Sequence, residues 1–185
     1  SQPSLSSESS AQLPGVYTAA RIHATFLYGV FGSETVLTDE TKLASVQKRL
    51  LGRIRLVITE TGGQFQDLGL GRFSATLGAK NSTEEDPLTA VTIGFKLLQL
   101  SAVTRKAPPL RLVAVTGRIS PERLHLTATS DEDSSLRGHG LLRRALRIME
   151  ECPPGALYVD GLTYRMIRSS HNCERVQEET PTPSP

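Results

Sequence analysis

The residues that could carry chemistry begin with a predicted β-hairpin, Gln64–Gly78, whose tight turn contains Gly69 and Gly71. Glycine permits the backbone conformations that such a turn requires. In an enzyme, a turn of this kind would present an acidic side chain or a backbone amide to a ligand. The residue between the two glycines is Leu70, an aliphatic side chain with no catalytic chemistry. The sequence therefore predicts a turn suited to a site, with an apolar residue at the position where the chemistry would be.

Arginines are the next candidates, since a guanidinium group binds phosphate or carboxylate through two parallel hydrogen bonds. Arg72 follows the turn, and Arg143, Arg144 and Arg147 lie close together on a predicted helix. These four could line a pocket for phosphate or another anion. The alternative interpretation places them on solvated faces or in salt bridges, where each contributes little to stability.

The other polar residues form no pattern typical of a metal site or a nucleophile, so we expect no metal and no cofactor. Asp67 beside a leucine is a poor metal site, and the acidic run Asp131, Glu132, Asp133 is interpreted as a solvated loop rather than a cation site. No nucleophile-elbow motif occurs, and Cys152, before two prolines, is expected to pack. The histidines lack the spacing of metal ligands and the cysteines form no CxxC motif; they are His23, His125, His139 and His171, with Cys152 and Cys173.

Length and charge limit the possible classes. The 185 residues predict one domain, and a net charge of +2, from 21 basic and 19 acidic residues, gives no general attraction to nucleic acid. No apolar run approaches the roughly 18 residues that span a bilayer, and the N-terminus lacks the features of a signal peptide. Two cysteines without a pairing pattern suit a reducing compartment. We therefore expect a cytoplasmic protein without a membrane span.

Hydrophobic periodicity predicts a mixed α/β (α+β) fold. The order β-α-β-β-α-β is that of the ferredoxin-like core, with both helices on one face of the sheet, and a β-α-type C-terminal extension follows. We expect a domain over residues 15–168, between a flexible Ser-rich linker at 1–14 and a flexible Pro/Thr/Glu tail at 169–185, cut from a longer protein. The predicted elements are a strand at 16–31, a helix at 39–61, the hairpin at 64–78, a helix at 84–103, strands at 110–119 and 123–129, a helix at 137–151, a strand at 156–160 and a helix at 161–168.

Several fragments, in order over about Arg21–Arg168, resemble the class III adenylyl/guanylyl cyclase catalytic domain. The sequence ATFLYGVFGSE at Ala24–Glu34 is similar to its first strand, and GLGRFSATLG at Gly69–Gly78 to its GDG hairpin. EEDPLTAVTIGFKLLQL is similar to the helix after that hairpin, and LRLVAVTGRI to the strand that ends in His-Thr-Gly. The most specific fragment is GLLRRALRIMEECPPGALYVDGLTYRMI, in which Pro153, Pro154, Gly155, Val159, Thr163, Tyr164 and Arg165 all fall in step.

The resemblance implies a chemistry that this sequence lacks. Class III cyclases hold two metal ions with two carboxylates, and Gly29 and Leu70 fall on those positions. Arg147 falls on the transition-state arginine, but Arg143 occupies the position of an asparagine. The purine-selecting acid falls near Gly140, and the purine-selecting lysine near Gln66 or Asp67. We therefore expect an inactive member of this family.

Three functions are compatible with the sequence. The first is a dimerisation or regulatory module of a larger signalling protein, which forms a homodimer or a heterodimer with another cyclase-type domain through apolar or neutral residues such as Tyr28, Phe31 and Leu70. The second is a sensor that binds a nucleotide or another anion in the old cleft with Arg72 and Arg147. The third is a divergent active cyclase, or a relative of the diguanylate cyclases, because GGQF at 62–65 is similar to their GGDEF motif without its two acids.

Overall fold

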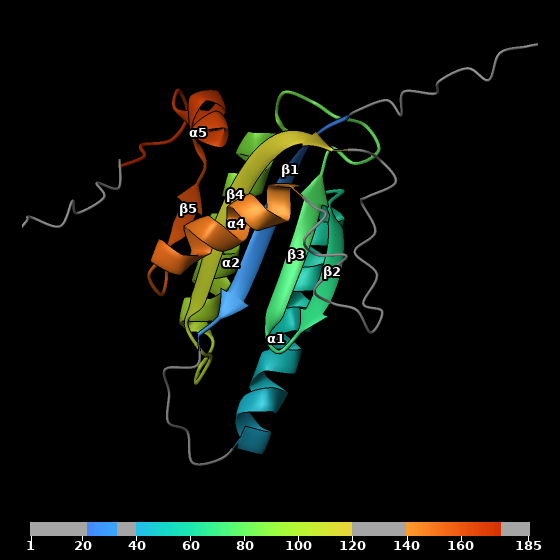
Figure 1. Ribbon diagram of the computed structural model, residues 1–185. Coiled ribbons are helices and arrows are strands. Elements are labelled where there is room, and N and C mark those ends of the chain that lie inside the picture. The colour runs from blue at the N-terminus through green and yellow to red at the C-terminus, as the bar shows by residue number, and fades with distance from the viewer. Residues whose placement is uncertain (1–21, 33–39, 120–139, 175–185) are drawn as a thin grey trace, which may run out of the picture.

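The computed structural model of this chain describes residues 22–32, 40–119 and 140–174 (Figure 1). The predicted strand at 123–129, His125, His139, the acidic run Asp131–Asp133, the linker 1–14 and residues 175–185 lie outside these ranges. The elements are β1 (Ile22–Phe31), α1 (Glu40–Glu60), β2 (Gln64–Gly69), β3 (Arg72–Leu77), α2 (Asp86–Val103), β4 (Leu110–Ile119), α4 (Gly140–Glu151), β5 (Leu157–Val159) and α5 (Gly161–Ile167).

The strands form a five-stranded sheet in the order β2-β3-β1-β4-β5. Neighbouring strands are antiparallel except for β4 and β5, which are parallel and are connected through α4. β1 lies between β3 and β4 and pairs with both, so it is the central strand. This topology confirms the predicted ferredoxin-like β-α-β-β-α-β core and its β-α extension.

Helices lie on both faces of the sheet (Figure 1). α1 and α2 cover one face, where Leu50, Ile54 and Ile58 of α1 pack against Leu27 and Leu112 of the strands. α4 crosses the other face, where its apolar side packs on Phe26, Tyr28, Val113 and Val115. The strands therefore alternate between two separate cores, with odd-numbered residues of β1 facing α1 and α2, and even-numbered residues facing α4.

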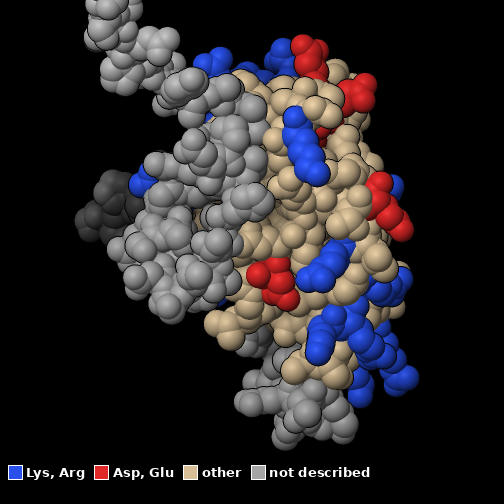
Figure 2. Space-filling view, turned by 90° about the vertical axis from the view of Figure 1, so that its right-hand side faces the viewer, with Lys and Arg blue, Asp and Glu red and all other residues tan. Residues whose placement is uncertain are grey.

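The outer side of α1 is basic. Its exposed cations occupy the positions that the helical periodicity assigns to solvent, and Figure 2 shows basic side chains gathered over the lower part of this side of the molecule. They are Lys48, Arg49, Arg53 and Arg55. None of the helices in the described ranges has both the length and the apolar character needed to cross a membrane.

The first residues of the predicted tail contact the domain. The backbone of His171 donates a hydrogen bond to the Ile167 carbonyl, and its ring stacks on Phe95 of α2 at a centroid distance of 5.7 Å. Cys173 packs against the core formed by α1 and α2. His171 and Cys173, which follow the boundary expected at residue 168, thus pack against the domain.

Candidate functional site

Gly29 lies near the C-terminal end of β1, between Phe73 on β3 and Leu112 on β4. A Cβ atom at this position would collide with the Phe73 ring and would lie 2.9 Å from Cδ2 of Leu112. Both neighbours are fully buried, and the Phe73 ring is held between Phe31 and Phe65, with centroid distances of 6.3 and 5.9 Å. Position 29 therefore faces the core of α1 and α2, and the phenylalanine ring occupies the space that a carboxylate would need.

Leu70 lies at the tip of the β2–β3 hairpin and is 91% exposed. The pairing of Gly69 with Arg72 leaves a two-residue turn, Leu70–Gly71, with φ values of 49° and 73°. A turn with two positive φ values favours Asn-Gly or Asp-Gly, because branched side chains are strained there. Gly71 is favoured by its positive φ, and a Cβ atom there would meet only the end of the flexible Gln47 side chain of α1. Leu70 thus gains no local packing in exchange for a strained backbone.

Replacing Leu70 with asparagine is expected to stabilise the fold by about 1 kcal/mol, because asparagine tolerates this conformation and leucine does not. Urea denaturation of dilute protein measures the change. Leu70→Ala is the matched control: it removes the same apolar group but keeps a Cβ in the left-handed region, so we expect no gain. A Leu70→Asn variant less stable than the parent would contradict the interpretation of the turn.

Asp67 stabilises the same hairpin and is not placed as a metal ligand. Its Oδ1 accepts a hydrogen bond from the Gly69 amide at 2.9 Å, next to an irregularity in the strand between Asp67 and Gly69. Such a contact is typical of an aspartate that closes a turn on its own backbone. In the described residues, no three His, Cys, Asp or Glu side chains come together as metal ligands.

The four arginines singled out from the sequence are divided between two places. Arg143 and Arg147 are exposed on α4, which packs on β4, β1 and β5, whereas Arg72 lies on β3. Arg144 forms an ion pair with Asp160 at 2.7 Å and also donates to the Thr116 carbonyl at 3.2 Å. The salt-bridge interpretation is therefore correct for Arg144, and the structure does not assemble all four around one anion.

Asp160 is the centre of a buried polar network that the sequence analysis missed. Its Oδ1 accepts hydrogen bonds from the Thr163 amide at 2.9 Å and the Thr163 hydroxyl at 2.6 Å, which caps the start of α5. The Thr163 hydroxyl lies 2.9 Å from that of Thr116, which lies 3.0 Å from that of Thr25. These side chains join α5 to β4 and β1. The spacing of Asp160 and Thr163 is a helix-capping signal that could have revealed the first contact.

A second arginine near Arg72 was also missed. Arg72 on β3 and Arg111 on β4 both lie opposite Val30 of β1, so they stand on either side of it on the α4 face of the sheet. The next residue of β1 on this face is Tyr28, whose side chain is 3% exposed and receives a hydrogen bond from Arg72. Burial raises the pKa of the Tyr28 hydroxyl, and the positive charges of Arg72 and Arg111 partly offset that rise. Arg111 escaped notice because it lies between two leucines at the start of the apolar run LRLVAVTGRI.

No family model matches the sequence, and no curated protein is similar to it. Solved structures are similar in fold. The adenylyl cyclase CyaB from P. aeruginosa superposes with a TM-score of 0.64 at 16% identity, over 82% of this chain and 83% of that one. A dimeric guanylyl cyclase domain of the RhoGC fusion protein from the fungus Blastocladiella emersonii gives 0.63 at 12% identity, over 80% and 84%. This chain has the fold of a class III cyclase catalytic domain. Another protein of this fold is the adenylate/guanylate cyclase/hydrolase from Silicibacter pomeroyi, with 0.59 at 18% identity over 83% of each chain.

The fragment most similar in sequence to cyclases shapes one edge of this cyclase fold. The exposed Pro153 and Pro154 follow α4, and Gly155, with φ of 78°, donates its amide to the Leu110 carbonyl to place β5 beside β4. Cys152 is buried, as expected for a packing residue, and burial raises the pKa of its thiol. These residues shape the edge of the sheet at which β5 lies.

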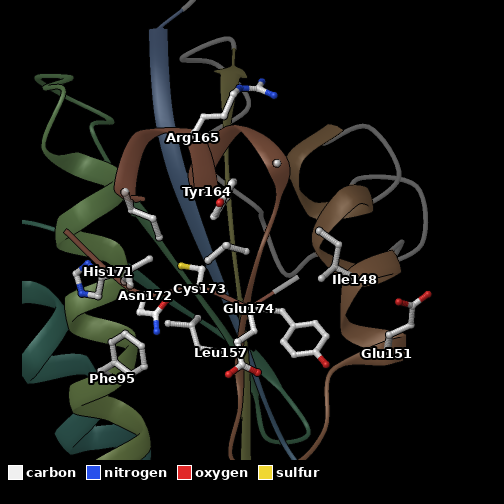
Figure 3. A pocket seen from close by; sticks show the side chains of 15 residues that line it. Phe95, Ile148, Glu151, Leu157, Tyr164, Arg165, His171, Asn172, Cys173 and Glu174 are labelled. Carbon is white, nitrogen blue, oxygen red and sulfur yellow. The ribbon is translucent and has the colours of Figure 1, made fainter. Parts of the chain in front are cut away.

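A groove of about 830 Å³ runs along β5 of the cyclase fold (Figure 3). Its wall is largely apolar, with Phe95, Ile148 and Leu157 contributed by α2, α4 and β5. Figure 3 shows the stacked Phe95 and His171 on one side and Glu151 on the other. Arg72, Arg143 and Arg147 do not line this groove. It is therefore separate from every site residue that the sequence predicted.

Proposed function

We propose that this chain is a non-catalytic cyclase-fold domain that acts as a dimerisation or regulatory module of a larger cytoplasmic signalling protein. The observation that carries the proposal is the Phe73 ring, which fills the space beside Gly29 where one metal-binding carboxylate was expected. The position of the other expected carboxylate is occupied by Leu70, whose side chain is exposed. Two-metal catalysis needs anionic oxygen ligands at both positions. A domain without them retains its surfaces and loses the chemistry.

The hairpin tip supports pairing with a second domain. Leu70 exposes an apolar side chain from a strained turn, and strain without a local gain is most often retained for function. Burial of this side chain by a partner would contribute about 1.5–3 kcal/mol to binding. Among proteins of similar fold, the guanylyl cyclase domain of RhoGC is described in one structure as dimeric and in another as monomeric. The partner we propose is a second copy or another cyclase-type domain.

The test combines an activity assay with light scattering. We expect no cyclic nucleotide from ATP or GTP with manganese, and a molar mass that rises from monomer to dimer with concentration. Leu70→Asn should weaken the dimer at least about tenfold while stabilising the monomer. Val103→Gln is the matched control, since Val103 is 79% exposed on α2 and should leave pairing unchanged. Cyclase activity above that of a mock preparation would overturn the non-catalytic proposal, and a strict monomer would overturn pairing.

The sensor alternative, with Arg72 and Arg147 as its proposed ligand-binding pair, stays a prediction. Arg147 is exposed on α4, on the part of the sheet formed by β4, β1 and β5, whereas Arg72 lies on β3 toward the other edge. The two arginines thus lie on different elements, and binding of one anion by both would bring the α4 surface and β3 together around it. Arg111 lies in register with Arg72, because both residues are the strand partners of Val30 in β1.

A further inference from the structure

One side of α1 carries positive charge that the described part of the domain does not neutralise. We call this side the basic face and define it by Lys48, Arg49, Arg53 and Arg55, all of which are exposed. Among the residues that the structure describes, no carboxylate forms an ion pair with any of these four side chains. Arg55 instead lies over the Phe65 ring of β2, with its guanidinium carbon 5.0 Å from the ring centroid. The proposed pairing function does not explain this concentration of charge.

The basic face also destabilises the helix that carries it. Arg49 and Arg53 are four residues apart, so they lie on the same side of α1, where like charges repel each other. The acidic side chain that the structure describes on α1 is Glu60, the last residue of the helix, and it is not within one turn of either arginine. Features that lower stability without a local gain are expected at functional sites. The basic face is therefore suited to a negatively charged partner.

Charge is separated along the layer that α1 and α2 form on one face of the sheet. The two helices run in opposite directions (Figure 1). Phe31, which precedes α1, pairs with Leu110, which follows α2, so α1 begins at the end of the sheet where α2 stops. The exposed Arg105 and Lys106 follow α2 and extend the positive charge of the basic face toward this end. The acidic side chains described for this layer lie where α1 ends and α2 begins, and they are Glu60, Glu84, Glu85 and Asp86.

An anionic lipid membrane fits the basic face better than a nucleic acid does. Leu56 lies among the cations, one turn beyond Arg53 and two turns beyond Arg49, and its side chain is 59% exposed. An apolar side chain among cations can be buried between lipid headgroups while the cations stay at the charged surface. α1 contains no aromatic residue, whereas single-stranded nucleic acids are bound by stacking their bases on aromatic side chains. The net charge of +2 for the whole chain also gives no general attraction to nucleic acid.

We propose that the basic face of α1, with Leu56 among its cations, binds the surface of an anionic lipid membrane. The lipids that it fits are phosphatidylserine and others whose headgroups carry net negative charge. Each Lys or Arg held near such a surface strengthens binding about fivefold. α1 then lies along the membrane, and α4, on the opposite face of the sheet, is directed away from it. The interaction goes beyond the pairing through Leu70 and does not require it.

Sedimentation of the full chain with lipid vesicles tests the proposal. We expect binding to vesicles of phosphatidylcholine and phosphatidylserine at about 7:3, none to phosphatidylcholine alone, and release at high salt, because ions screen the charges. Combining Arg49→Gln with Arg53→Gln should weaken binding about 25-fold. Combining Arg143→Gln with Arg147→Gln is the matched control, since these arginines are also exposed and four residues apart, but lie on α4. The control should bind the mixed vesicles as the parent does.

Two further variants separate charge from folding and a membrane from other anions. Combining Arg49→Lys with Arg53→Lys keeps both charges and should retain binding to the mixed vesicles, with circular dichroism as the check on folding. Leu56→Ser should weaken vesicle binding severalfold and leave the weaker binding of a DNA duplex unchanged.

The membrane proposal has four outcomes that would overturn it. They are equal binding to vesicles with and without phosphatidylserine, an α4 control that loses as much affinity as the α1 variant, a lysine variant that is folded but no longer binds, and a DNA duplex that binds more tightly than the mixed vesicles at the same salt concentration. Vesicle binding by Leu56→Ser equal to that of the parent would overturn the role of Leu56. None of these results depends on cyclase activity or on the molar mass.

Discussion

Replacing Gly29 with aspartate is expected to lower the free energy of unfolding by at least about 3 kcal/mol, not to create a metal site. The new side chain would meet the Phe73 ring and Leu112, both fully buried. Overpacking in such a place costs about 1–3 kcal/mol, and a carboxylate without polar partners adds a desolvation cost of similar size or larger. Urea denaturation at neutral pH, with and without manganese, measures both effects.

Two controls separate steric crowding from charge. Gly29→Ala tests crowding alone, and combining it with Phe73→Leu should cost less than the sum of the two single changes by about 0.5–3 kcal/mol, because the smaller side chain makes room. Gly52→Ala, in α1 where nothing lies within 4 Å, should be stabilising. A Gly29→Asp variant that is as stable as the parent and is further stabilised by manganese would contradict the packing that we describe.

Removing the Asp160 carboxylate by Asp160→Ala is expected to cost about 2–4 kcal/mol. The change takes away the cap of α5 and leaves the buried Thr163 and Thr116 groups without their acceptor. The ion pair with Arg144 is a minor part of this loss, because the Arg144 side chain is 47% exposed and solvent screens it. Chemical denaturation monitored by circular dichroism gives the value.

Two matched variants show how much of this loss of stability comes from the helix cap and how much from the ion pair. Asp160→Asn keeps an acceptor for the Thr163 groups and removes the charge, so it should cost clearly less than Asp160→Ala. Arg144→Met removes the ion pair alone and should cost less than about 1 kcal/mol. If Arg144→Met proves as damaging as Asp160→Ala, the ion pair and not the cap holds this edge of the domain together.

The fold was predictable because its strongest signals are local. Leu50, Ile54 and Ile58 repeat at helical spacing, and all three side chains are fully buried. The apolar run at Leu110–Ile119 forms a strand with the predicted bounds. The two glycines around Leu70 likewise predicted the turn, whose positive φ values they accommodate.

The site was less predictable because it depends on strand register and on contacts between distant residues. A sequence aligned on Gly29 does not reveal which face of the sheet that residue occupies, and a shift of one residue exchanges the two faces. Arg72 and Arg111 are neighbours of Val30 only after β1 pairs with both β3 and β4. Thr25, Thr116 and Thr163 are similarly far apart in the chain, so their hydroxyl contacts have no local signal.

β5 leaves one border of the described sheet open. The Ala156 carbonyl accepts a hydrogen bond from β4, and the Asp160 amide donates one to it. Because such bonding alternates along a parallel strand, the amides and carbonyls of Leu157 and Val159 point away from β4, on the side of the groove that these two residues line. His171, Asn172, Cys173 and Glu174 line the same groove as Leu157 and Val159 (Figure 3). Among the described strands, β5 thus has a strand neighbour on one side only, whereas β1 is paired on both sides.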